Sequence, residues 1–265
     1  MSAPPARTPG RSGAEETPLK ADPAAQLKLL DVQSVDSTLD QLRHQRATLP
    51  ELAEIAELQA KRTDVDNLAR DARIAVDDLT TEQKKVDADV EAVKARRARD
   101  RDRMDQGLVT NPKDLERMQH ELESLERRIS TLEDEELEVM EKLEEAQTEL
   151  TKLEAMVQET DERLAVLAAA RDEKLAALDE RIQEVHDRRG PAAEGLPDDL
   201  LTLYVRLREQ KGGVGAAALR ARECGGCRLT LDSAELTRIK GLPEDEVVRC
   251  EECQRILVRT AESGL

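Results

Sequence analysis

The sequence predicts a mainly α-helical protein, in which a long antiparallel coiled-coil hairpin is followed by a small domain built around four cysteines. Three observations lead to this fold class. The 265 residues include no Phe, no Trp and one Tyr, and 37% are charged, which is typical of long helices with thin packing. Apolar residues recur three and four positions apart over most of the chain. All four cysteines lie near the C-terminus in two close pairs.

The N-terminal part of the chain divides into a tail and the first helical arm. Residues 1–21 are rich in Pro, Ala, Gly, Ser and Thr without periodicity, which predicts a disordered tail. The hairpin is predicted over residues 22–190, with its first arm at roughly 24–103. At Pro50 this arm either kinks or restarts with Thr48 as its cap. The apolar seam of the arm contains Val32, Val35, Leu39, Leu42, Arg46, Leu49, Leu58, Arg62, Val65, Ala69, Ala72, Val76, Leu79, Gln83, Val86, Val90 and Val93.

A short turn separates the two arms, and we place the tip of the hairpin at residues 104–112. Asn111 followed by Pro112 is a strong signal for the start of a helix. The second arm, 113–189, nearly equals the first in length, so we expect the arms to fold back on each other. Pairing in trans between two chains is the alternative, because heptads alone do not fix the partner. The seam of the second arm contains Leu115, Met118, Leu122, Leu125, Ile129, Leu132, Glu136, Val139, Leu143, Ala146, Leu150, Leu153, Val157, Thr160 and Leu164.

The cysteines have the spacing of a metal site. Two Cys-x-x-Cys pairs are separated by twenty-two residues, and four thiolates suit the tetrahedral coordination of zinc. We therefore predict one structural zinc ion in a closed site, within a zinc-ribbon domain over residues 191–265 that begins with a short helix from Pro197 to about Lys211. Residues 228–231 and 255–258 are predicted to be short strands packing on the site. The predicted ligands are Cys224, Cys227, Cys250 and Cys253.

Two other kinds of chemistry fit the same cysteines. The pairs could be redox dithiols or disulfides, and Cys-Gly-Gly-Cys does resemble a redox motif, but no βαβ pattern accompanies it. Thiols normally stay reduced in the cytosol, which favours metal binding. Iron remains an alternative metal, because four thiolates suit both ions.

Charge is distributed unevenly along the chain. The formal net charge is −17, yet residues 94–103 carry six basic and two acidic side chains, while residues 113–163 carry seven basic and eighteen acidic ones. The basic run lies at the predicted tip. It is either a partner-binding tip for an acidic protein or a nucleic acid, or a solvated helix end that faces the acidic arm. Its basic residues are Lys94, Arg96, Arg97, Arg99, Arg101 and Arg103.

Several classes of function are disfavoured by the sequence. No apolar run is long enough to span a bilayer, and the N-terminus has no apolar signal-peptide core, so we expect a cytoplasmic protein without membrane contact. The sequence contains no nucleophile elbow, no glycine-rich phosphate loop and no HExxH motif. We therefore expect neither enzymatic activity nor a small-molecule substrate.

Particular segments resemble a known bacterial family. These are residues 107–115 with 119–122, residues 204–208 with 212–219, and residues 224–231 with 247–257. They are similar to the four-cysteine zinc-ribbon proteins with a coiled-coil hairpin, which include a flagellar chaperone of epsilonproteobacteria and a chlamydial relative, and the sequence looks most like the actinobacterial branch. The resemblance implies an adaptor with zinc held by the four cysteines. Members of that family bind the nitrogen-type sigma factor, secretion or flagellar components, and in one case a messenger RNA, but the resemblance does not identify the partner of this chain.

Two functions follow as hypotheses. The first is a non-enzymatic, chaperone-like adaptor whose hairpin and zinc ribbon bind protein partners. The second is a nucleic-acid-binding protein acting through the ribbon and the basic tip. Residues 220–262 carry nine acidic residues against eight basic ones, and the chain has no aromatic platform on which bases could stack. The eight basic residues are Arg220, Arg222, Arg228, Arg238, Lys240, Arg249, Arg255 and Arg259.

Overall fold

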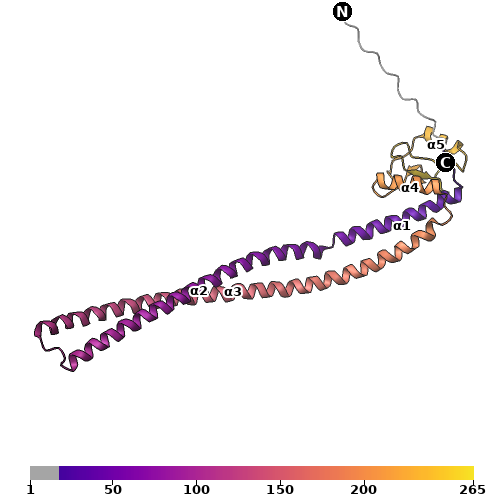
Figure 1. Cartoon of the computed structure of the whole chain (residues 1–265). Helices are drawn as coiled ribbons and strands as arrows, with labels where there is room; N and C mark the ends of the chain where they lie inside the picture. Colours follow the sequence, from indigo (N-terminus) through magenta and orange to yellow (C-terminus); the bar gives the residue numbers. More distant parts are fainter. Residues whose placement is uncertain (1–17) are drawn as a thin grey trace, which may run out of the picture. The chain divides into compact units, whose positions relative to one another are not determined.

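The computed structural model describes residues 18–265 (Figure 1). Most of the predicted disordered tail, residues 1–17, lies outside the described residues. Its last part differs from the prediction, because residues 19–21 pair with the ribbon. The amide N of Ala21 donates to the carbonyl O of Asp245 at 2.7 Å, and the amide N of Val247 donates to the carbonyl O of Leu19 at 2.9 Å. The boundary predicted at residue 21 is therefore a few residues too late.

The described chain divides into two compact units. One is Pro50–Arg171, and the other joins the residues up to Leu49 to Asp172–Leu265. Helix α3 (Pro112–Ala193) contributes to both units. The sequence had suggested a boundary at residues 190 and 191. The units divide elsewhere, because α1 (Pro23–Ala47) and the last turns of α3 pack with the C-terminal elements.

The Pro50–Arg171 unit is a two-helix coiled coil. Helix α2 (Pro50–Asp105) runs antiparallel to the first part of α3 within the same chain (Figure 1). The buried side chains form a narrow seam, as predicted from the three-and-four spacing. This confirms the coiled-coil hairpin. The buried seam residues are Ile55, Ala69 and Val90 on α2, and Leu125, Ile129, Leu132, Val139, Leu143 and Leu153 on α3; only Ile55 lies outside the predicted seam.

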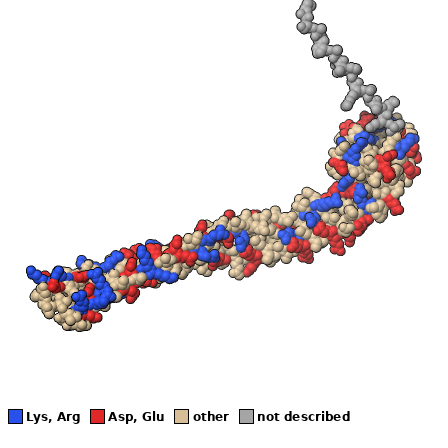
Figure 2. Space-filling model, in the orientation of Figure 1, with Lys and Arg blue, Asp and Glu red and all other residues tan. Residues whose placement is uncertain are grey.

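Ion pairs between the helices fix their direction and register. Residue numbers rise along α2 as those of their partners fall along α3, which is the pattern of an antiparallel pair. Lys and Arg alternate with Asp and Glu over much of the surface shown in Figure 2. Within residues 18–265, no helix is both long and apolar enough to cross a membrane. The ion pairs between α2 and α3 include Arg62–Asp161 at 2.7 Å, Arg73–Glu154 at 2.5 Å, Lys94–Glu133 at 2.8 Å and Arg97–Glu126 at 2.7 Å.

The turn between α2 and α3 follows the predicted signals. Helix α2 ends at Asp105 and α3 begins at Pro112. Gly107 has a φ of +65°, a left-handed conformation in which glycine has no steric penalty. The side-chain oxygen of Asn111 accepts a hydrogen bond from the amide N of Lys113 at 3.1 Å, which satisfies one of the free N–H groups at the helix start.

The seam supports a prediction about hairpin stability. Leu132 is 2% exposed, whereas Leu137 on the same helix is 59% exposed. We expect Leu132→Ala to lower the free energy of unfolding of the hairpin by about 2–5 kcal/mol, because it removes buried methyl groups and leaves a cavity. The matched change Leu137→Ala is expected to cost about 0.5 kcal/mol or less. Urea unfolding followed by far-UV circular dichroism would compare the two, and equal losses would contradict the seam.

The other unit combines helices with a small sheet. Helix α1 ends at Ala47 and α2 starts at Pro50, so the chain restarts its helix there. Helix α4 (Asp198–Gln210) agrees with the predicted short helix. The sheet has the order β2-β1-β3, formed by Glu223–Cys224, Ala216–Arg220 and Ile256–Val258. Strand β1 pairs with β2 antiparallel and with β3 parallel.

The predicted strands around the cysteines are only partly correct. Residues 256–258 form β3, but residues 228–231 make a single bridge, between Thr230 and Glu223. The prediction also lacked helix α5 (Ser233–Gly241), where the side chain of Asp232 accepts a hydrogen bond from the amide N of Glu235 at 2.7 Å. The strand that organises the sheet is instead the Ala/Leu stretch at β1, because it pairs with both other strands.

A buried polar cluster connects α1 with α3 and α4. The carboxylate of Asp36, whose side chain is 3% exposed, accepts hydrogen bonds from Arg189 Nε at 2.7 Å and from Tyr204 Oη at 2.8 Å. Arg208 Nε lies 3.6 Å from the same carboxylate, and Arg208 also pairs with Asp40 at 2.5 Å. The cluster positions α4, and through it the sheet that carries the cysteines.

The buried polar cluster makes the stability of this unit fall at alkaline pH. Burial, followed by the hydrogen bond to Asp36, raises the pKa of Tyr204 well above its usual value. Because the unfolded chain ionises this phenol near pH 10, the contribution of the buried neutral phenol is present below that pH and is lost as the pH rises above it. Tyr204 is the one tyrosine of the sequence, so its ultraviolet absorbance reports it alone. We expect phenolate to appear together with unfolding of this unit, and ionisation near pH 10 in the folded protein would contradict the cluster.

Candidate metal centre

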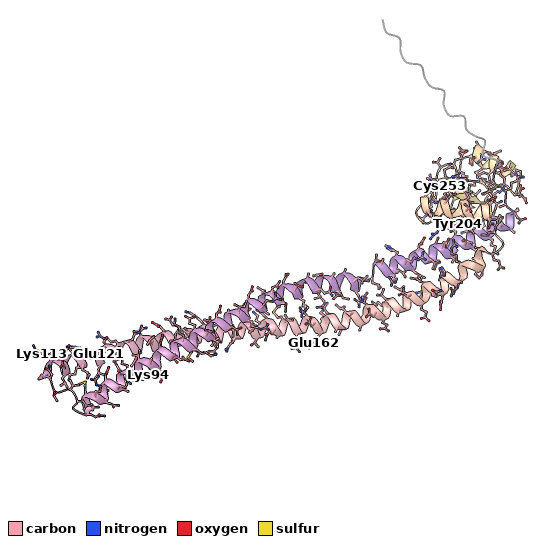
Figure 3. All side chains as sticks on the ribbon, in the orientation of Figure 1. Lys94, Lys113, Glu121, Glu162, Tyr204 and Cys253 are labelled. Atoms are coloured by element: carbon pink, nitrogen blue, oxygen red, sulfur yellow. The ribbon has the colours of Figure 1, made fainter. Side chains whose placement is uncertain are left out.

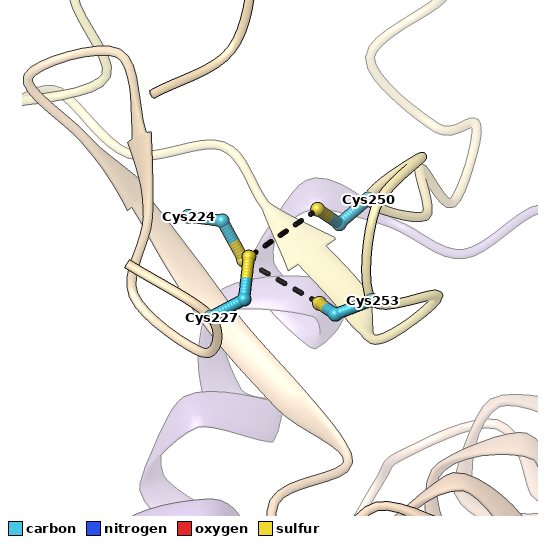
Figure 4. A group of neighbouring side chains, drawn as sticks. All are labelled: Cys224, Cys227, Cys250 and Cys253. Carbon is cyan, nitrogen blue, oxygen red and sulfur yellow. Dashed lines mark hydrogen bonds between the residues drawn. The ribbon is translucent and has the colours of Figure 1, made fainter. Parts of the chain in front are cut away.

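The four cysteines meet between two turns of the C-terminal unit. Cys224 ends β2 and Cys227 lies in the turn that follows, while Cys250 and Cys253 flank a second turn (Figure 4). The Sγ atoms of Cys224 and Cys253 are 3.8 Å apart, and those of Cys227 and Cys250 are 3.9 Å apart. All four sulfurs lie within 4.8 Å of one another. The structure thus brings together every cysteine that the sequence predicted as a ligand.

The two turns have the same backbone design. In the first, the amide N of Arg228 donates to the carbonyl O of Cys224 at 2.7 Å, and in the second the amide N of Gln254 donates to the carbonyl O of Cys250 at 2.8 Å. Arg228 and Gln254 have φ values of 61° and 63°, a left-handed conformation that is uncommon outside glycine. The repeated geometry aims both cysteines of each pair at one point, which is the arrangement that a tetrahedral metal site requires.

The glycines of the first turn allow it to pack closely on the sheet. The amide N of Gly225 donates to the carbonyl O of Ala218 at 3.0 Å. A Cβ atom on Gly226 would lie 2.7 Å from the side chain of Arg255 and 3.2 Å from the Cβ of Ala217. A larger residue at Gly226 would therefore displace the Arg255 side chain and press the first turn against β1.

The electrostatics of the cluster indicate a need for positive charge. Burial raises the pKa of the Cys224 thiol, and it raises that of Cys250 to about 12. At Cys253 burial also opposes ionisation, but hydrogen bonds from Arg255, Cys250 and Cys227 together outweigh it and lower the pKa to about 7. Four thiolates at these distances would repel one another strongly without a cation between them.

The site fits zinc in its donor set and its dimensions. Zn–S bonds of about 2.3 Å at tetrahedral angles place the sulfurs about 3.8 Å apart, close to the two distances of 3.8 and 3.9 Å. Cys224 and Cys250 are buried, and Cys227 and Cys253 are half-buried. Four sulfur donors would fill the coordination shell, so the ion would supply folding free energy and hold the two turns together.

Most arginines near the cysteines bind the ribbon's own backbone or its own carboxylates. Arg255 donates to the carbonyl oxygens of Val214 at 2.9 Å and Lys211 at 2.7 Å. Arg259 donates to four carbonyl oxygens of the loop at residues 242–246, and Arg238 pairs with Glu235 at 2.6 Å. The sequence had grouped these arginines as candidate phosphate ligands. The structure assigns their guanidinium groups to internal contacts.

The basic run of α2 is divided in two by its contacts. Lys94, Arg96 and Arg97 form ion pairs with Glu133, Glu121 and Glu126 of α3. Arg99, Arg101 and Arg103 are exposed and make no side-chain hydrogen bond or ion pair with any described residue. The first half of the run therefore has the structural role that an acidic neighbouring arm suggested, and only the second half has no ion-pair partner among the described residues.

Some residues that shape the site were not singled out from the sequence. Gln33, on α1, accepts hydrogen bonds on Oε1 from the amide N atoms of Gly215 at 2.7 Å and Ala216 at 3.2 Å, and so holds the start of β1. Its partners lie more than 180 positions away, and no local pattern marks such a contact.

The comparisons with known proteins agree with this geometry. Residues 32–212 match the family described as the CT398-like coiled coil hairpin domain, and residues 224–257 match the C4-type zinc ribbon domain. An uncharacterized protein of Mycobacterium tuberculosis is 36% identical over 241 residues, which cover 91% of this chain and 98% of that protein. An uncharacterized protein of Mycobacterium leprae is 28% identical over 82% of this chain and 93% of its own length.

Two solved structures have the same fold. A protein of Mycobacterium smegmatis aligns with a TM-score of 0.80 and 35% identity, covering 91% of this chain and all of that one. The structure of CT398 from Chlamydia trachomatis aligns with a TM-score of 0.69 at 19% identity, covering 89% and 98% of the two chains, which shows a shared fold alone. The predicted resemblance is thereby confirmed, and the chain belongs to the family of CT398-like coiled coil hairpin proteins with a C4-type zinc ribbon.

Proposed function

We propose that this protein is a non-enzymatic adaptor that binds protein partners through its helical hairpin and its zinc ribbon. One structural zinc ion, held by the four cysteines, would keep the ribbon folded. The observation that carries the proposal is the internal use of the ribbon's arginines. Because Arg238, Arg255 and Arg259 bind the ribbon's own backbone or carboxylates, the ribbon offers few free cations to phosphates.

The shape of the described cavities also supports binding rather than catalysis. One of them, of about 630 Å³, is an open groove between α2 and α3. Its charged rim is already paired, with Arg73 bound to Glu154 and Asp161 bound to Arg62. Enzyme sites usually combine an enclosed pocket with perturbed titratable groups that are available to a substrate. The matched families are themselves structural modules, a coiled coil and a zinc ribbon.

A binding screen tests the proposal. Zinc-loaded protein would be immobilised and exposed to a lysate of the organism that encodes it, with and without nuclease, and bound material identified by mass spectrometry and RNA sequencing. We expect specific protein partners that survive nuclease treatment. Loss of all partners on nuclease treatment, together with enriched RNA, would reject the adaptor in favour of nucleic-acid binding.

A variant shows which end of the protein binds. Cys250→Ser with Cys253→Ser removes two predicted zinc ligands, while Leu229→Ala changes a half-exposed side chain beside the first turn without touching a cysteine. Partners that are lost with the double serine variant and kept with Leu229→Ala would dock on the folded ribbon. Partners that both variants retain would dock on the hairpin.

A further inference from the structure

The end of the hairpin combines free cations with exposed apolar surface. Arg99, Arg101 and Arg103 have no ion-pair partner among the described residues, and the same holds for the side chain of Lys113 just after the turn. Between them, Leu108 is 66% exposed. Figure 2 shows basic and uncharged surface side by side at this end, and Figure 3 places Lys94, Lys113 and Glu121 there.

The ion pairs of the coiled coil indicate which residues of α3 lie across from these arginines. In an antiparallel helix pair, the numbers of facing residues add up to a constant. The pairs Arg62–Asp161 and Arg97–Glu126 have the same sum. The same register places uncharged Ser124 and Leu122, and then His120, across from positions 99, 101 and 103. No described carboxylate of α3 forms an ion pair with the last three arginines, whereas Glu121 and Glu126 are paired with Arg96 and Arg97.

The rest of the hairpin would direct an acidic ligand to this end. The whole chain has a net charge of −17, and residues 113–163 of α3 are strongly acidic. A ligand rich in carboxylates is repelled by that flank and attracted to the free arginines, which both concentrates and orients it. Arginine is also a residue type that contributes strongly at protein interfaces when it lies beside apolar surface.

The pattern of charges favours a protein over a nucleic acid. Asp102 and Asp105 alternate with the free arginines, so the surface has cations separated by anions. A continuous row of phosphates would meet both signs, whereas separate carboxylates can each reach one guanidinium. An exposed leucine beside the cations suits an aliphatic side chain, and the end of the hairpin has no Phe, Tyr or Trp ring for base stacking.

We propose that Arg99, Arg101, Arg103, Leu108 and Lys113 form a docking surface, here called the turn surface, for an acidic protein segment that carries at least one large aliphatic side chain. The inference rests on the proposed adaptor function and specifies the chemistry of one partner. The carboxylates of that segment would pair with the guanidinium groups while the aliphatic group covers Leu108.

Peptide selection on the full-length, zinc-loaded protein tests the turn surface. Phage that display random peptides would be selected on it, and the enriched peptides synthesised with a fluorescent label. We expect enrichment of Asp and Glu around Leu, Ile or Met. The triple variant Arg99→Gln, Arg101→Gln, Arg103→Gln should weaken binding of such a peptide by about tenfold or more, and added salt should weaken it further.

The chain offers a matched control for this variant. Lys94→Gln, Arg96→Gln, Arg97→Gln removes the same charge from the same helix, but at positions already paired with α3. It is expected to leave peptide affinity within about twofold, provided that circular dichroism shows an intact hairpin. Leu108→Ser should weaken binding without changing its salt dependence. Equal losses in both triple variants, or selected peptides without acidic residues, would overturn the proposal.

Three further outcomes show whether this inference or the proposed function fails. A uridine oligonucleotide that binds the turn surface more tightly than the best peptide would identify a nucleic acid as the occupant and overturn the proposal. Protein partners recovered from lysate equally by the intact chain and by the Arg99, Arg101 and Arg103 variant would reject the turn surface but keep the adaptor. If the intact chain recovers no protein at all, the adaptor itself fails.

Discussion

Removal of zinc is expected to unfold the ribbon while the helices of the Pro50–Arg171 unit keep their structure. The ribbon has a small core, formed largely by Ala217, Leu219, Ile239, Val248 and Leu257 together with the cysteines. Such a core stabilises little by apolar burial alone. Binding of a structural zinc by thiolates contributes an apparent free energy of roughly 10–16 kcal/mol at neutral pH. We therefore expect no measurable folded ribbon once the metal is removed.

Hydrogen exchange with mass spectrometry measures this effect region by region. After treatment with a strong chelator, or in the variant Cys250→Ser with Cys253→Ser, amides of residues 216–258 should lose their protection, while those of the Pro50–Arg171 unit should retain it. Elemental analysis should find one zinc per chain before treatment and none after. Leu229→Ala serves as the control. Leu229 is 50% exposed, so this substitution should leave both regions protected. A ribbon that stays protected without metal would show that its fold does not depend on zinc.

The helices and the cysteine site could be predicted from sequence because their signals are local. The seam spacing, the Asn111-Pro112 start and the two Cys-x-x-Cys turns each involve residues within a few positions of one another. Helix capping and heptad packing act over the same short range. The direction of the hairpin followed from its short turn and from arms of similar length.

The small sheet was predicted less well, because its pairing is long-range. Strand β1 consists mainly of alanine and lies next to β3, with Ala217 paired to Leu257. Alanine is depleted in strands, so β1 becomes a strand through its partners and not through its own propensity. The same reason explains the pairing of residues 19–21 with residues 245–247, which are more than two hundred positions away.

The basic run shows the limit of charge patterns in a sequence. Six basic residues within ten positions indicated one surface. A helix end that faces an acidic arm was one of the two interpretations of this run, but the sequence did not show that Arg97 would pair with Glu126 while Arg103 would pair with no described carboxylate. That difference depends on the register of the two helices, which the heptads alone leave open to shifts of one turn.

Substitution of Asp36 is also expected to have a large effect. It should lower the free energy of unfolding of the unit that contains the ribbon. The Asp36 side chain is 3% exposed and binds Arg189, Tyr204 and Arg208. Asp36→Ala would leave these guanidinium groups beside a cavity, and Arg208 Nε is already buried without a hydrogen-bond partner. Breaking a buried pair by removing one member typically costs about 3–5 kcal/mol. Asp40→Ala, on the same helix, removes a 41% exposed partner of Arg208 and should cost about 1 kcal/mol or less.

Tyr204 provides the probe for this comparison, because it is the one aromatic residue of the sequence and is fully buried beside Asp36. Its fluorescence during urea unfolding therefore reports this unit and not the Pro50–Arg171 unit. Asp36→Asn separates charge from shape, since the amide oxygen can still accept from the phenol while the negative charge is lost. If the ion pairs dominate, Asp36→Asn should lose most of the stability that Asp36→Ala loses. If instead Asp36→Asn behaves like the wild type, the cluster stabilises the junction by packing and hydrogen bonding, and Asp36 would be replaceable by a neutral residue of its size.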